Sequence, residues 1–143
     1  MKILVIHGPN LNLLGQREPD HYGEQTIDSI NGLLQAEATQ LAVDLRIEQS
    51  NHEGQIVELI QNESPNFAGL IINPAAFTHT SIAIRDAISA TGIATVEVHL
   101  SNIYQREEFR HHSYIAPVSI GQISGFKQQS YRLALHALVD YLK

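Results

Sequence analysis

Glu97 and His99 are the pair whose residue types and spacing point most directly to acid–base chemistry. They lie two residues apart in ATVEVH, a segment with the composition of a strand, so their side chains are expected on the same face. A carboxylate beside an imidazole fixes the tautomer of the ring and favours its protonated form, which makes the imidazole a general acid. The spacing also fits a solvated polar strand end, and both interpretations stay open on spacing alone.

Arg17 and Tyr22 form a second candidate pair, in the polar stretch of residues 15–25. A free tyrosine loses its proton near pH ~10, so it is a poor base at neutral pH unless a cation stabilises the phenolate. An arginine against the ring oxygen would supply that cation without losing its own proton. Solvated Tyr and Arg residues are common in loops, and the pattern alone favours that simpler interpretation.

Arg110 lies three residues after Glu107 and directly before His111 and His112. Its planar guanidinium could hold a substrate carboxylate or hydroxyl, although a surface ion pair with Glu107 is the commoner use of this spacing. Adjacent histidines point in different directions, and the chain has no HExxH motif, so no metal site is expected.

The composition excludes several kinds of chemistry. The 143 residues are 43% hydrophobic, enough for a core, and their net charge of −6 lacks the basic surface that nucleic acids require. There is no cysteine, and the three lysines (Lys2, Lys127 and Lys143) leave Schiff-base chemistry without a well-placed amine. Because no signal peptide and no apolar run of roughly 18 residues is present, we expect a cytoplasmic protein without a membrane partner.

Strands and helices that alternate along the chain would position these residues. Apolar patterns predict strands at residues 2–6, 45–49, 69–72, 94–99 and 117–120, the second more polar and so nearer an edge. Helical patterns predict helices at 26–41, 53–62, 80–90 and 128–142, with Thr26 as an N-cap and Gly92 as a stop. This alternation predicts a single α/β domain over residues 1–143: a flavodoxin-like, doubly wound, five-stranded parallel sheet with helices on both faces.

Ligands of such sheets bind beyond the carboxyl ends of the strands. Polar residues follow three of the predicted strands there: Asn10, then Asn73 with His79, then Ser101 with Asn102. Amides, hydroxyls and imidazoles suit a polar or anionic small molecule better than a metal ion. The stretch at about 15–25 has the length and composition of a functional lid loop.

Four longer blocks of sequence carry a more specific signal. They are GPNLNLLGQREPDHYG (8–23), SNHEGQIVELI (50–60), INPAAFTHTSIAIRDAI (72–88) and EVHLSNIYQREEFRHHSY (97–114). In this order they resemble the type II 3-dehydroquinate dehydratases, essentially from the first residue to the last helix. The resemblance implies reversible anti elimination of water from 3-dehydroquinate to 3-dehydroshikimate through an enolate, without metal, Schiff base or other cofactor. Both the shikimate pathway and quinate breakdown use this reaction.

The resemblance also implies a role for each matched residue. Tyr22 would remove the proton beside the ketone, and Arg17 would lower the pKa of Tyr22 and close the lid. Asn10 would hold a water near the enolate oxygen, and His99, oriented by Glu97, would protonate the departing hydroxyl. The substrate's carboxylate and hydroxyls would be bound by Asn73, His79, Ser101, Asn102, the backbone N–H of Ile103, and Arg110.

An assembly is implied as well, because the family forms trimers packed into dodecamers in which Asp86 would reach the site of a neighbouring subunit. Two other function classes compete with this interpretation: a non-catalytic flavodoxin-like module that binds a small anion, and a metal-dependent hydrolase that uses the histidines. Enone formation in the presence of a chelator would distinguish the dehydratase from both.

Overall fold

Five parallel strands form the centre of the molecule. A computed structural model describes residues 1–16 and 25–143. The strands are β1 (Lys2–His7), β2 (Asp44–Gln49), β3 (Gly69–Asn73), β4 (Ala94–His99) and β5 (Gly121–Ser124). Their order is β2-β1-β3-β4-β5, with the polar strand β2 at an edge, as its sequence predicts. The chain runs from β1 out to β2 and returns to β3 on the other side of β1, so the sheet is doubly wound.

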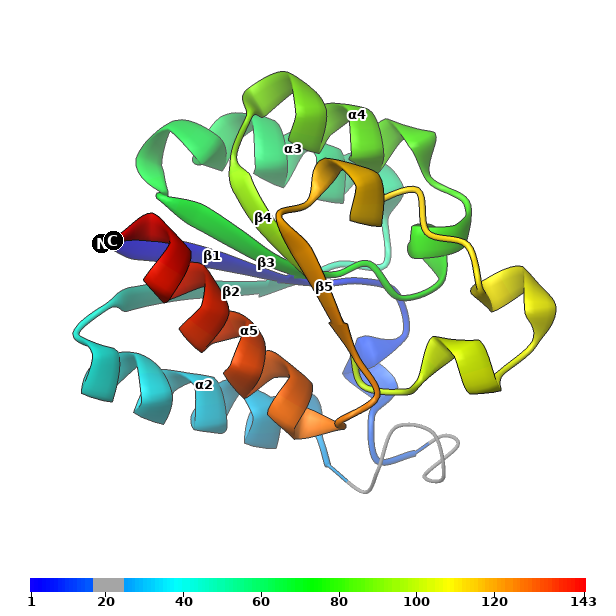
Figure 1. Cartoon of the computed structure of the whole chain (residues 1–143), viewed down its shortest axis with the longest axis horizontal. Helices are drawn as coiled ribbons and strands as arrows, with labels where there is room; N and C mark the ends of the chain where they lie inside the picture. The colour runs from blue at the N-terminus through cyan, green and yellow to red at the C-terminus, as the bar shows by residue number, and fades with distance from the viewer. Residues whose placement is uncertain (17–24) are drawn as a thin grey trace.

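Two pairs of helices cover the two faces of this sheet (Figure 1). α2 (Ile27–Leu41) and α5 (Gln128–Leu142) pack on one face, and α3 (Glu53–Glu63) and α4 (Ile82–Thr91) pack on the other. Alternate residues of β1 therefore enter different halves of the core, which explains why this strand is apolar without interruption. The predicted flavodoxin-like α/β fold is confirmed.

The helix ends follow the predicted capping residues closely. Thr26 begins α2 with a capping box: its hydroxyl accepts from the Ser29 N–H at 3.1 Å, and the Ser29 hydroxyl accepts from the Thr26 N–H at 3.0 Å. Gly92 ends α4 in the left-handed conformation, at φ 67°. The start of α4 differs by two residues from the prediction, because the hydroxyl of Ser81, the second residue of the predicted segment, accepts from the Ile84 N–H and caps the helix there.

The predicted position of the last strand, residues 117–120, is wrong. Residues Ala116–Val118 form a 3-10 helix, η6, and β5 begins only at Gly121. Pro117 explains the difference, because proline has no N–H for a sheet ladder and its φ suits the first turn of a helix. The true strand, GQIS, gives no apolar signal because it lies at the open edge beyond β4.

Short 3-10 helices follow the carboxyl ends of the strands, toward the lower right of Figure 1. They are η1 (Leu11–Leu13) after β1, η3 (Ala75–His79) after β3, and η4 (Ile103–Gln105) with η5 (Glu108–Arg110) after β4. The two chain ends lie at the opposite edge. Across the described residues, no helix combines the length and apolar composition needed to cross a membrane.

Candidate active site

A cavity of about 180 Å³ opens at the carboxyl edge of the sheet, between the loops that follow β1, β3 and β4. Seven of the residues that the sequence singled out line it: Asn10, Asn73, His79, His99, Ser101, Ile103 and Arg110. The remaining lining residues are Pro9, Leu11, Ala75, Ala76, Leu100 and Arg106. The fold thus brings together groups that are up to a hundred positions apart in the chain.

A close approach of two turns forms one wall of the cavity. The Gly8 N–H donates to the carbonyl of Asn73 at 2.7 Å, and a Cβ at Gly8 would lie only 2.6 Å from the Pro74 oxygen. Only glycine fits between these backbones. Asn10 follows in the left-handed region at φ 68°, which asparagine tolerates, and its N–H donates to the side chain of Asn51 at 3.0 Å. This turn places Asn10 at the cavity.

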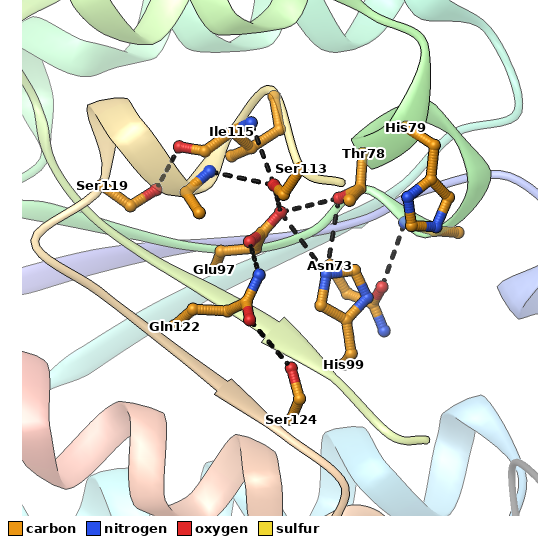
Figure 2. A network of polar contacts seen from close by, with 12 residues as sticks. Asn73, Thr78, His79, Glu97, His99, Ser113, Ile115, Ser119, Gln122 and Ser124 are labelled. Atoms are coloured by element: carbon orange, nitrogen blue, oxygen red, sulfur yellow. Dashed lines mark hydrogen bonds and ion pairs between the residues drawn. The ribbon is translucent and has the colours of Figure 1, made fainter. Parts of the chain in front are cut away.

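Glu97 is fully buried and lies next to His99 of the cavity lining (Figure 2). The hydroxyls of Thr78 and Ser113 each donate to its Oε1 at 2.7 Å, and the amide of Gln122 donates to its Oε2. His99 Nε2 lies 3.4 Å from the same Oε1. Burial opposes the charge of Glu97, but the hydrogen bond and charge of His99, with the bonds from Gln122 and Ser113, hold its pKa below the usual range. The residue is therefore a carboxylate.

These contacts fix the orientation of the His99 ring. Thr78 gives its only hydroxyl hydrogen to Glu97, so its oxygen can only accept from His99 Nε2, 3.4 Å away. Nε2 therefore carries a hydrogen and faces two acceptors. Within the described part of the chain, Nδ1 has no hydrogen-bond partner, so it is the nitrogen left for a ligand in the cavity. An imidazolium here would present the Nδ1 hydrogen as an acid.

His79 is built as a neutral acceptor. Its Nδ1 lies 2.7 Å from the carbonyl of His112, which can only accept, so Nδ1 carries the hydrogen. Burial lowers the pKa of His79; the bond to His112 opposes this, and the nearby charges of His99 and Arg110 lower it further. The neutral ring leaves Nε2 as a lone pair at the cavity, suited to accept a hydrogen bond from a hydroxyl.

Positive charge on the far side of the cavity comes from η5 and the segment before it. Arg110 donates from Nε to Glu107 at 2.6 Å, the i,i+3 pair that the spacing suggested, yet it also lines the cavity and keeps its other N–H donors. The two interpretations of Arg110 therefore hold together. Arg106, four positions earlier, also lines the cavity and was missed by the sequence analysis.

Among the described residues, three predicted site residues are not in the cavity lining: Glu97, which contacts His99 from the core, Asn102 and Asp86. Asn102 caps η4 by accepting from the Tyr104 N–H at 3.2 Å. Ile103 is the first residue of η4, so its N–H has no intrahelical partner. Asp86 is exposed on α4, paired with Arg85 at 3.2 Å. Arg17 and Tyr22 lie outside the described residues, as does most of the predicted lid.

The adjacent histidines His111 and His112 serve other contacts. His111 Nε2 lies 3.0 Å from the carbonyl of Arg106, whereas the ring of His112 packs edge-on against Tyr114. Among residues 1–16 and 25–143, no group of three or more His, Cys, Asp or Glu side chains is arranged to hold a metal ion. The metal-dependent hydrolase therefore gains no support from the described side chains.

Comparison with known proteins yields matches along nearly the whole chain. The family model Dehydroquinase class II matches residues 1–139. The 3-dehydroquinate dehydratase of Trichodesmium erythraeum is 65% identical over 141 residues, covering 99% of this chain and 94% of that protein. The crystal structure of type II dehydroquinase from Butyrivibrio crossotus has a TM-score of 0.94 at 44% identity, covering 96% of this chain and 97% of that one. The type II dehydroquinase from Propionibacterium acnes gives 0.93 at 40% identity, with 97% and 96% covered.

Proposed function

The chain belongs to the class II dehydroquinase family and catalyses the dehydration of 3-dehydroquinate, and from this premise we propose that the cavity beyond β1, β3 and β4 is its active site. The observation that carries the proposal is the buried carboxylate of Glu97, which engages Nε2 of His99 and leaves Nδ1 for a ligand. A hydro-lyase needs an acid for a poor leaving group, and this pair provides one.

The acid step is assigned to His99. Its imidazolium donates the Nδ1 proton to the departing hydroxyl, which leaves as water. Before this transfer, the negative charge of Glu97 stabilises the positively charged ring of His99. Glu97 also holds the orientation of the ring throughout, because hydrogen bonds from Thr78 and Ser113 keep the carboxylate fixed. The return of a proton to Nδ1 restores the acid for the next turnover.

The base step is assigned to Tyr22 with Arg17 on the family resemblance alone. A phenolate at Tyr22 removes the proton from the carbon beside the ketone, and the guanidinium of Arg17 stabilises that phenolate. The electrons move into an enolate, whose oxygen is stabilised by a water on Asn10. Asn10 has a defined place at the cavity because its left-handed backbone and its bond to Asn51 fix the turn.

Substrate binding is assigned to the polar lining. The guanidinium of Arg110 and the backbone N–H of Ile103 suit the carboxylate of dehydroquinate. The neutral His79 accepts from a ring hydroxyl, and the remaining hydroxyl and carboxylate contacts come from Asn73, Ser101 and Asn102. No cofactor takes part in these steps.

We further propose a cytoplasmic dodecamer built from trimers, in which Asp86 contributes to a neighbouring subunit's site. The exposed position of Asp86, with 64% of its side chain accessible, supports a contact outside its own chain. Light scattering on the purified protein tests the assembly. A monomeric protein with full activity would contradict it.

The test of the proposed site is the absorbance of the conjugated enone formed from 3-dehydroquinate, measured with and without a chelator. We expect chelator-insensitive turnover that Tyr22→Phe abolishes while the circular dichroism spectrum stays unchanged. Tyr141→Phe, at an exposed position near the end of α5, is the matched control and keeps full activity. Near-normal turnover by Tyr22→Phe would overturn the base, and loss of turnover with the chelator would overturn the metal-free mechanism.

A further inference from the structure

A chain of hydrogen bonds connects Asn73, in the cavity lining, with α5, β1 and α2. The amide Nδ2 of Asn73 lies 3.0 Å from the hydroxyl of Tyr131 on α5, and this hydroxyl lies 2.9 Å from Nδ1 of His7. Nε2 of His7 lies 2.8 Å from Oδ1 of Asn31 on α2. Tyr131, His7 and Asn73 are at most 3% exposed, so water does not compete with the two contacts of Tyr131. None of the steps proposed above uses Tyr131 or His7.

The donors and acceptors of this chain have one consistent direction. Oδ1 of Asn31 can only accept, so Nε2 of His7 carries the hydrogen and Nδ1 of the neutral ring accepts from the Tyr131 hydroxyl. The hydroxyl oxygen of Tyr131 then accepts from Nδ2 of Asn73. Burial lowers the pKa of His7 to about 4 and raises that of Tyr131, so both groups stay neutral at working pH.

The other end of the Asn73 amide is also fixed, since Oδ1 accepts from the Ala75 N–H at 3.1 Å. If the Asn73 amide were flipped, Nδ2 would point at the N–H of Ala75, and the bonds to Ala75 and Tyr131 would both be lost. One Nδ2 hydrogen and one Oδ1 lone pair then remain for a ligand, in fixed places. Asn73 lines the cavity.

We propose that Tyr131 and His7 are positioning residues for the dehydration reaction, because they hold the amide of Asn73 in the one orientation that presents an N–H donor to an oxygen of the substrate. This inference rests on the proposed role of Asn73 in substrate binding. It assigns a function to the side chains under the cavity, which touch no substrate themselves. The hydrogen-bond chain also gives α2 and α5 a direct influence on the site.

The test is a double-mutant cycle in kcat and KM for 3-dehydroquinate. Tyr131→Phe keeps the ring in the core but removes the hydroxyl, and we expect kcat/KM to fall roughly fivefold through KM, the loss typical of one hydrogen bond. In an Asn73→Ala background the same substitution should change kcat/KM by less than about twofold, because the amide it positions is gone. Equal effects in both backgrounds would overturn the positioning role.

His7 supplies the second arm of the test. His7→Asn places an amide oxygen near the position of Nδ1, where it can accept from the Tyr131 hydroxyl, so this variant should keep a near-normal KM. His7→Leu has no acceptor there and should raise KM as much as Tyr131→Phe does. Val139→Ala, at a fully buried position of α5 outside the hydrogen-bond chain, is the matched control: it loses stability and keeps KM. If His7→Asn and His7→Leu give the same KM, the proposal fails.

The outcomes separate this inference from the proposed function. If Asn73→Ala leaves kcat/KM unchanged, the role of Asn73 in substrate binding is wrong and the inference falls with it. If Asn73→Ala lowers kcat/KM but Tyr131→Phe does not, the substrate contact stands and only the positioning role is overturned.

Discussion

At the scale of single residues, the orientation of His99 depends on the buried negative charge of Glu97. Glu97 is fully buried, where an unpaired carboxylate would take up a proton. Burial works against its charge, but His99, Gln122 and Ser113 together leave its pKa below the usual range. The carboxylate is thus a fixed acceptor for Nε2 of His99, which leaves Nδ1 for the acid role proposed above.

Removal of the imidazole should separate the two chemical steps. In His99→Ala we expect dehydration to fall by about 10²–10⁴-fold, the usual contribution of a general acid, while exchange of the proton beside the ketone partly persists. Deuterium incorporation into 3-dehydroquinate, followed by NMR, measures the exchange. His52→Ala, at an exposed position before α3, is the control and should affect neither step. Loss of exchange together with dehydration would contradict the stepwise assignment.

Sequence patterns at this scale predict pairs but not networks. Glu97 and His99 were found because a strand places residues two apart on one face. Thr78, Ser113 and Gln122 were missed because each reaches Glu97 across 16 to 25 positions, a separation that leaves no periodic signal. The contact of His7 with Tyr131 spans 124 positions and likewise leaves no periodic signal.

At the scale of elements, the long helices and buried strands were predictable and the short turns that carry the site were not. Apolar periodicity identifies α2 or β1 because many residues repeat one pattern. A 3-10 helix of three residues such as η4 has no period to detect, although it supplies the Ile103 N–H. β5 was misplaced for a related reason, since Pro117 and a weakly apolar edge strand give conflicting local signals.

The turn after β1 provides the element-scale prediction. A methyl group at Gly8 would meet the Pro74 backbone at 2.6 Å, so Gly8→Ala must push the β1 and β3 turns apart. We expect a loss of about 1–3 kcal/mol in the free energy of unfolding and a sharp fall in kcat/KM, because Asn10 and Asn73 are displaced. Gly32→Ala, in α2 with nothing within 4 Å, should instead stabilise by about 0.5–1 kcal/mol. Urea denaturation measures the stability of each variant, and the enone assay measures its kcat/KM. The same stability and kcat/KM in Gly8→Ala and Gly32→Ala would contradict the close approach of Gly8 to the Pro74 backbone.

At the scale of the whole molecule, two sets of polar contacts connect α2 with α5, one near the surface and one in the core. On the surface, Glu37 of α2 accepts from Arg132 and His136 of α5, each at 2.8 Å. In the core, Asn31 and Tyr131 of the same helices meet through His7. The first contact is half-buried, and because Arg132 and His136 remain accessible to solvent, it contributes little to stability. The second is buried, so its contribution depends on the charge state of one imidazole.

His7 should therefore make the stability of the whole fold depend on pH. Burial lowers its pKa from 6.5 to about 4, so between these values the unfolded chain binds a proton that the folded chain does not. The free energy of unfolding is therefore unaffected by protonation of His7 above pH 6.5, and it falls by up to about 3 kcal/mol as the pH drops toward 4. The pKa of His79 is also lowered, so His79 adds to this dependence of stability on pH. Carboxyl groups with a lowered pKa, such as Glu97, change the stability only below their ordinary pKa of 4.5. We expect urea denaturation at pH 7 and pH 5 to show a smaller difference in His7→Asn than in the wild type and in His52→Asn; equal differences in all three would show that His7 is not buried as a neutral ring.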